Sequence, residues 1–141
     1  MENKRYLGID YGTRRVGVAV SDPMGVIARP LDTLIIDSMG QAVEKIGDLI
    51  VEYEPVGVVV GNPISMSGDE SELSLLVDEF VELLKDTTDV PVTYEDERLS
   101  SVQAKQVLHS HGKKIKGNKE IIDRIAAAIV LQSFLDRNSG V

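Results

Sequence analysis

The sequence predicts an α/β fold in which a central mixed five-stranded sheet is flanked by helices, with residues 1–141 forming a single domain. Two observations predict this class. The N-terminal part carries strand-like segments joined by short turns, whereas the rest alternates helical periodicity with short apolar runs. Because tight hairpins join antiparallel strands and helical crossovers join parallel ones, we expect three antiparallel strands followed by two strands parallel to the first.

The antiparallel part is predicted over three segments. Residues 6–10 and 15–21 have the composition of strands, and the link between them is short and contains Gly12, as a hairpin requires. A third strand is expected over residues 26–34. Pro30 should confine part of it to a sheet edge or a bulge, because proline cannot donate to the ladder.

Helices and strands are expected to alternate in the rest of the chain. Ser38 and Gln41 form a capping-box pattern that begins a helix reaching about Tyr53. The uninterrupted apolar run at residues 56–60 predicts a buried strand. The remaining expected elements are a helix over residues 69–85, a strand over 91–95, a helix from 100 to about 112 and a helix from 118 to about 137. This is the order of elements of an RNase H-like fold.

Composition excludes several classes of protein. The absence of cysteine excludes disulfides, thiolate metal sites and a cysteine nucleophile. No apolar run approaches the roughly 20 residues of a membrane helix, so we expect no membrane association. The N-terminus lacks the apolar stretch of a signal peptide. A cytoplasmic location is therefore expected.

Charge is distributed unevenly along the chain. The net charge is −8, yet residues 98–119 carry six basic side chains and no acidic one. Such a segment would orient a polyanion towards one edge of the protein. We therefore predict that Lys113, Lys114 and Lys116 contact nucleic acid, with a solvated lysine-rich loop as the alternative.

Three acidic side chains are candidates for metal-dependent phosphodiester hydrolysis. With two Mg²⁺ or Mn²⁺ ions about 4 Å apart, this reaction requires carboxylates that converge from strand ends and a neighbouring helix. Asp10 ends the first strand, Glu97 follows the fifth, and Asp123 lies on the last helix. Alternatively, Asp10 caps its own turn, and the other two only complement helix N-termini. Strand alternation places Glu95 on the same face as Glu97 but leaves open which face carries the site.

Four motifs together resemble the YqgF (RuvX) family of small RNase H-like proteins. They are GIDYGTRRVGVA at residues 8–19, VVGNP at 59–63 with Gly68 downstream, DERLS at 96–100 and DRIAA at 123–127. This family is described both as Holliday-junction resolvases and as nucleases that mature the 5′ end of pre-16S ribosomal RNA. The resemblance spans essentially the whole chain, with the motifs in family order and at family spacing.

The resemblance implies roles for individual residues. Asp10, Glu97 and Asp123 would be the catalytic carboxylates and would bind Mg²⁺ or Mn²⁺. Arg98 and Lys119 would face phosphate, and Arg14 and Arg15 on the first hairpin would also contact nucleic acid. No role is assigned to Asn62, where the family usually has a hydrophobic residue, or to residues 64–68.

The implied function is that of a metal-dependent endonuclease in ribosome biogenesis, which processes the 5′ end of pre-16S rRNA and has ribosomal precursor particles as partners. One alternative is a Holliday-junction resolvase acting on branched DNA, which would need a symmetric homodimer, whereas RNA processing allows a monomer. Another is a non-catalytic module that binds RNA during ribosome assembly. The GIDYGT motif also resembles the phosphate loop of actin-like ATPases, but those proteins need two lobes to enclose ATP.

Overall fold

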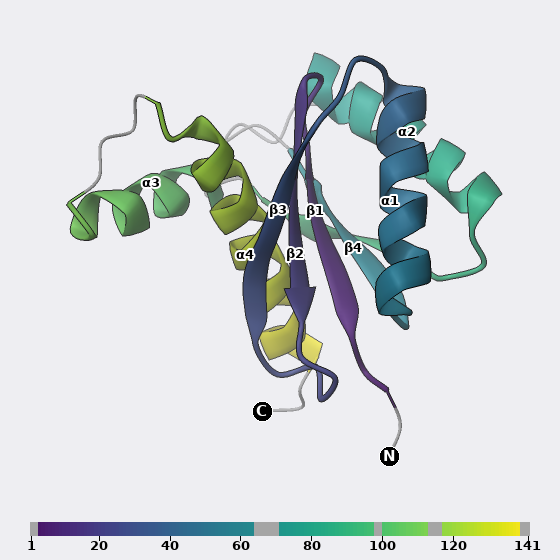
Figure 1. The fold of residues 1–141 in the computed structure, drawn as a ribbon, viewed down its shortest axis with the longest axis horizontal. Coiled ribbons are helices and arrows are strands. Elements are labelled where there is room, and N and C mark those ends of the chain that lie inside the picture. The colour runs from purple at the N-terminus through teal and green to yellow at the C-terminus, as the bar shows by residue number, and fades with distance from the viewer. Residues whose placement is uncertain (1–2, 64–70, 98–99, 113–116, 139–141) are drawn as a thin grey trace.

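The computed structural model describes residues 3–63, 71–97, 100–112 and 117–138, and their elements follow the predicted order (Figure 1). The elements are β1 (Tyr6–Tyr11), β2 (Arg15–Ser21), β3 (Ala28–Ile35), α1 (Met39–Tyr53), β4 (Gly57–Asn62), α2 (Glu72–Thr87), β5 (Val92–Asp96), α3 (Ser100–Ser110) and α4 (Lys119–Asn138).

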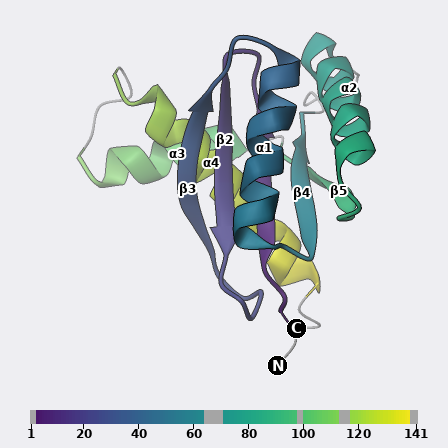
Figure 2. The same cartoon turned by 45° about the vertical axis from the view of Figure 1, so that its right-hand side comes forward.

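A five-stranded mixed sheet forms the centre of the molecule, with strand order β3-β2-β1-β4-β5 (Figure 2). The β1–β2 and β2–β3 pairs are antiparallel, whereas β4 is parallel to both β1 and β5. Pro30 lies on the edge strand β3, next to an irregularity in the β2–β3 register. The prediction of an edge or bulge position for this proline is therefore confirmed.

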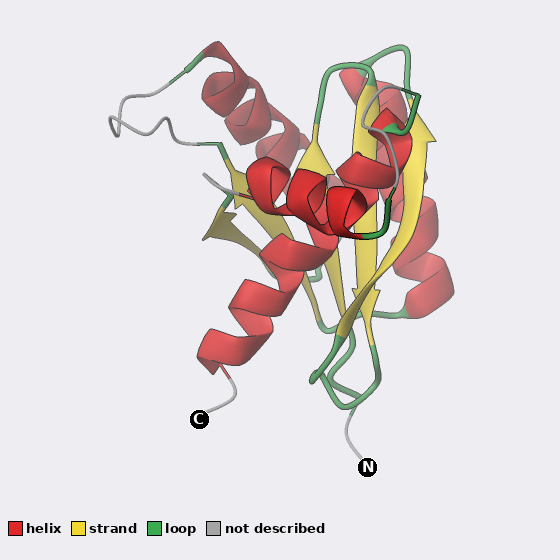
Figure 3. Cartoon of the chain, turned by 90° about the vertical axis from the view of Figure 1, so that its left-hand side faces the viewer, coloured by secondary structure: helices red, strands yellow, loops and turns green. Residues whose placement is uncertain are grey.

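Helices cover both faces of the sheet. Helices α1 and α2 pack with Leu7, Ile9 and Tyr11 of β1 into the larger apolar core. Helix α4 covers the opposite face, and α3 packs against α4 as the outermost element on that side (Figure 3). Side chains alternate between the faces of a strand, so Gly8 and Asp10 face α4.

Helix α4 approaches the sheet closely because glycine stands at the contact points. A Cβ added at Gly17 would lie 2.0 Å from the carbonyl oxygen of Asp123, and one added at Gly8 would lie 2.7 Å from the Cβ of Leu131. Both distances are far below van der Waals contact, so larger residues would force the helix away from β1 and β2. These glycines thereby fix the height of Asp123 above the strand that carries Asp10.

Helix starts follow capping chemistry that the sequence shows only in part. The Ser38 side chain accepts a hydrogen bond from the backbone N–H of Gln41, as predicted for α1. Helix α2 begins at Glu72, later than expected, and its cap is Ser71, whose hydroxyl accepts from the N–H of Ser74. No helix in the described ranges has both the length and the apolar character needed to span a membrane.

Candidate active site

Asp10 occupies the penultimate position of β1, on the face covered by α4. Its side chain is half-buried, whereas Ile9 and Tyr11 on either side are buried in the core of the other face. Tyr11 stacks on Phe80 with ring centroids 4.6 Å apart, so this ring has a packing role. The strand end is therefore rigidly held while the carboxylate projects towards α4.

Glu97 follows the last residue of β5 and extends the pairing of that strand with β4. Its backbone N–H donates to the carbonyl oxygen of Asn62 at 3.3 Å, so the main chain of Asn62 helps to place it. The side chain lies over Gly61, where an added Cβ would come within 2.3 Å of Oε2 of Glu97. Gly61 thus leaves the space that this carboxyl group fills.

Asp10 and Glu97 hydrogen-bond to each other, although they come from opposite ends of the sequence. Burial, the hydrogen bond to Asp10 and the negative charge of Asp10 together raise the pKa of Glu97 to about 10, with burial as the largest cause. Burial also raises the pKa of Asp10, which the bond from Glu97 lowers and the charge of Asp123 raises. Without a cation, the pair therefore holds a proton on Glu97, which donates to Asp10.

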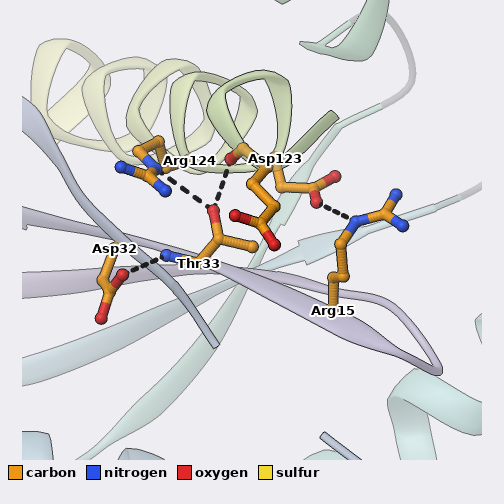
Figure 4. A network of polar contacts seen from close by, with 6 residues as sticks. Arg15, Asp32, Thr33, Asp123 and Arg124 are labelled. Carbon is orange, nitrogen blue, oxygen red and sulfur yellow. Dashed lines mark hydrogen bonds and ion pairs between the residues drawn. The ribbon is translucent and has the colours of Figure 1, made fainter. Parts of the chain in front are cut away.

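Asp123 is in the second turn of α4 and close enough for its charge to act on Asp10. Its Oδ2 accepts from Nε of Arg15 at 2.5 Å, and both side chains are largely shielded, being 20% and 37% exposed respectively (Figure 4). The three predicted carboxylates are thus gathered at one end of the sheet. Within the described ranges, however, no three acidic or histidine side chains are already placed to ligate a single ion.

Glu95 shares the α4 face with Glu97, as alternation predicts, but it belongs to a different contact. Its buried carboxylate accepts from the Ser133 hydroxyl at 2.8 Å and pairs with the guanidinium of Arg137. This cluster joins β5 to the C-terminal part of α4. Glu95 therefore anchors the helix and leaves Glu97 as the acid at the site.

Thr33 of β3 fixes the start of α4, a role that the sequence did not indicate. Its hydroxyl donates to the backbone carbonyl of Glu120 and accepts from Nε of Arg124 (Figure 4). These contacts flank Asp123 in the helix. A threonine on a distant strand gives no sequence signal of such a contact, because only the tertiary fold brings it to α4.

A cavity of about 400 Å³ opens next to the carboxylates. Its lining includes Asp10 and Asp123 together with Arg14 and Arg15 of the first hairpin. Lys119 is exposed at the first position of α4. The other predicted nucleic-acid contacts (Arg98, Lys113, Lys114 and Lys116) and residues 64–68 lie outside the described residues.

Sequence comparison identifies a family over nearly the full chain. The family model described as "RuvX: Holliday junction resolvase" matches residues 4–137. A protein of Lactococcus lactis subsp. lactis named "Putative pre-16S rRNA nuclease" is 41% identical over 137 residues, with 96% of both chains covered. A Sulfurihydrogenibium protein of the same name is 43% identical, covering 96% of this chain and 92% of its own.

Solved structures show the same fold at low sequence identity. RuvC of T. thermophilus, solved with a Holliday junction substrate, matches with a TM-score of 0.62 at 18% identity, over 97% of this chain and 96% of that one. The Holliday junction resolvase of fowlpox virus matches with a TM-score of 0.55 at 13% identity, over 94% and 99%. The expected RNase H-like architecture is thereby confirmed.

Proposed function

This chain belongs to the RuvX family of phosphodiester-hydrolysing nucleases, and we propose that it cleaves precursor 16S ribosomal RNA near the mature 5′ end in a metal-dependent reaction. One observation carries the proposal. Asp10 and Glu97, from the ends of β1 and β5, lie in hydrogen-bond contact and hold a proton between them, with the charge of Asp123 beside them. Carboxyl groups gathered in this way repel one another when ionised and favour a divalent cation.

The donor set fits Mg²⁺ or Mn²⁺, both of which prefer oxygen ligands. Asp10, Glu97 and Asp123 are the residues that would hold the ions, with the Glu97 proton released and Asp123 turned from Arg15. Bound as a pair, such ions activate water and stabilise the leaving oxygen of a phosphodiester. The raised pKa of Glu97 makes this exchange dependent on pH, because the proton and the cation compete for the same oxygens.

The basic side chains around the carboxylates would bind the substrate backbone. Arg14 and Arg15 line the same cavity as Asp10 and Asp123, and Lys119 begins the helix that carries Asp123. Guanidinium groups suit bidentate contacts to phosphate. We assign these three residues to holding the strand while the carboxylates act on one phosphodiester.

The test is cleavage of a pre-16S rRNA fragment by purified protein with Mg²⁺ or Mn²⁺. Asp10→Asn should abolish cleavage, because the amide keeps the shape but not the charge, while circular dichroism shows the fold intact. The matched control is Asp48→Asn, which changes an exposed acid on α1. This variant should cleave the RNA as fast as the unchanged protein. If Asp10→Asn cuts as fast as the unchanged protein, Asp10 is not catalytic. If the unchanged protein binds the RNA but cuts it with neither metal, a non-catalytic assembly role is favoured.

A second candidate function is resolution of Holliday junctions, which the description of the family model favours. The same carboxylates would then act on branched DNA, with two sites presented by a symmetric dimer. A four-way DNA junction assayed beside the RNA fragment separates the two substrates. Faster cleavage of the junction, together with a dimer in sedimentation, would replace the ribosomal RNA proposal.

A further inference from the structure

A second cavity lies beside the carboxylates, between β2 and the start of α4, with a volume of about 370 Å³. We call it the basic pocket, because three cations (Arg15, Lys119 and Arg124) line it against one acid, Glu120. Its volume is in the range of about 300–1,000 Å³ that is usual for ligand sites. Such a concentration of positive charge is unusual for a chain with a net charge of −8.

Two of the cations come from different elements and are held in place by other side chains. Nε of Arg15 on β2 donates a hydrogen bond to Asp123 at 2.5 Å, and Nε of Arg124 on α4 donates one to the Thr33 hydroxyl at 3.2 Å (Figure 4). Each of these bonds uses one of the five N–H donors of a guanidinium group. Both groups are therefore fixed in position and retain donors for an anion.

The position of the basic pocket identifies its ligand. Arg15 also lines the cavity that contains Asp10 and Asp123, so one side chain forms a wall of both spaces. A nucleic-acid strand carries a phosphate at every nucleotide, and a strand with one phosphate at the carboxylates brings neighbouring phosphates close to this wall. We propose that the basic pocket binds a backbone phosphate of the substrate strand, adjacent to the phosphate that is cleaved. This inference rests on the proposed nuclease function.

Binding to the basic pocket can be measured without cleavage. The Asp10→Asn protein is titrated, in EDTA, with a fluorescent single-stranded RNA oligonucleotide that lacks terminal phosphates. The affinity is followed from roughly 50 to 200 mM salt, where each phosphate contact adds about 0.7 to the slope of log K against log salt. The variants compared in this background are Lys119→Gln, Lys119→Arg and Lys85→Gln.

The pocket predicts a specific pattern among these variants. Lys119→Gln should weaken binding roughly three- to tenfold at low salt, as expected for one lost charged contact, and reduce the slope by about 0.7. Lys119→Arg should keep both values, because it keeps the charge. Lys85→Gln should also keep them, because Lys85 is in the last turn of α2 and distant from the strand ends that carry the site.

Several results would overturn the proposal. Equal salt slopes for Lys119→Gln and Lys85→Gln would show that no phosphate occupies the pocket. An effect that appears only with a 5′-phosphorylated strand would assign the pocket to a strand end and not to an internal phosphate. The two proposals can fail separately. If only the pocket proposal is wrong, cleavage still depends on Asp10. If the proposed function is wrong, the unchanged protein does not cleave the RNA, and the salt slopes alone decide whether the pocket binds a phosphate.

Discussion

Replacing Gly61 with alanine tests whether the position of Glu97 controls the reaction. The added Cβ would stand 2.3 Å from Oε2 and 2.7 Å from Cδ of Glu97, so the carboxyl group must move. These two atoms are the far end of a flexible side chain, and the third contact, the Cβ of Glu97 at 3.1 Å, requires a shift of only a few tenths of an ångström. The strand can therefore keep its place while the acid leaves Asp10.

The magnitudes follow from this difference between side chain and backbone. Overpacking a buried site typically costs about 1–3 kcal/mol, and we expect Gly61→Ala to fall at the lower end because Glu97 can swing aside. Activity should fall much further, since a displacement of about 1 Å at a reacting centre can cost roughly a hundredfold in rate. The variant should thus lose activity out of proportion to stability.

Urea unfolding and RNA cleavage, measured on the same samples, separate the two effects. Gly47→Ala is the matched control, because Gly47 lies inside α1 and an added Cβ there meets nothing within 4 Å. Alanine at this position should raise the free energy of unfolding by about 0.5–1 kcal/mol and leave cleavage unchanged. If Gly61→Ala cleaves within a few-fold of the unchanged protein, the placement of Glu97 over Gly61 is irrelevant to catalysis and the reasoning fails.

Two further predictions concern the same end of the sheet. Because the pKa of Glu97 is raised to about 10, the folded protein binds more protons than the unfolded chain above the pKa of a free glutamate. Without metal, the urea concentration at the unfolding midpoint should therefore decrease as the pH is raised from about 6 to about 8, and Glu97→Gln should make this decrease smaller. Equal pH dependence in both proteins would show that Glu97 does not hold the proton. Thr33→Val should lower the free energy of unfolding by about 1–2 kcal/mol, because it removes the hydroxyl bonded to the Glu120 carbonyl and to Arg124. Thr93→Val, on an exposed position of β5, is its control and should change stability little, and similar losses for the two valines would contradict the role of Thr33.

Strand direction was predictable from the sequence because it depends on local signals. The hairpin at Gly12 and the helices between the later strands determine which pairs are antiparallel and which are parallel. Element ends were less predictable: β4 continues through Asn62, past the apolar run, because its pairing with β5 extends to Asp96. A strand ends where its partner ends, and the partner lies more than thirty residues away in the sequence.

The acids of the site were predictable as residues but not as an arrangement. The family motifs named Asp10, Glu97 and Asp123, yet no pattern showed that Glu97 would hold a proton against Asp10 or that Asp123 would bind Arg15. The close approach of α4 was equally hidden, since Gly17 is an ordinary small residue until its partner is known. These contacts join distant segments, and only packing decides them.

The negative charge of the three carboxylates is compensated in two different ways, one of which involves the basic pocket. A proton compensates the Asp10–Glu97 pair, whereas the guanidinium of Arg15 compensates Asp123. Arg15 is also a wall of the basic pocket, so a phosphate bound there through its remaining donors shares the positive charge of Arg15 and weakens the ion pair with Asp123. A strand that attracts Arg15 would release Asp123 towards Asp10 and Glu97, raising the negative charge at the point where a divalent ion must bind. Occupation of the basic pocket should therefore favour metal binding, and by reciprocity a bound metal should favour the strand.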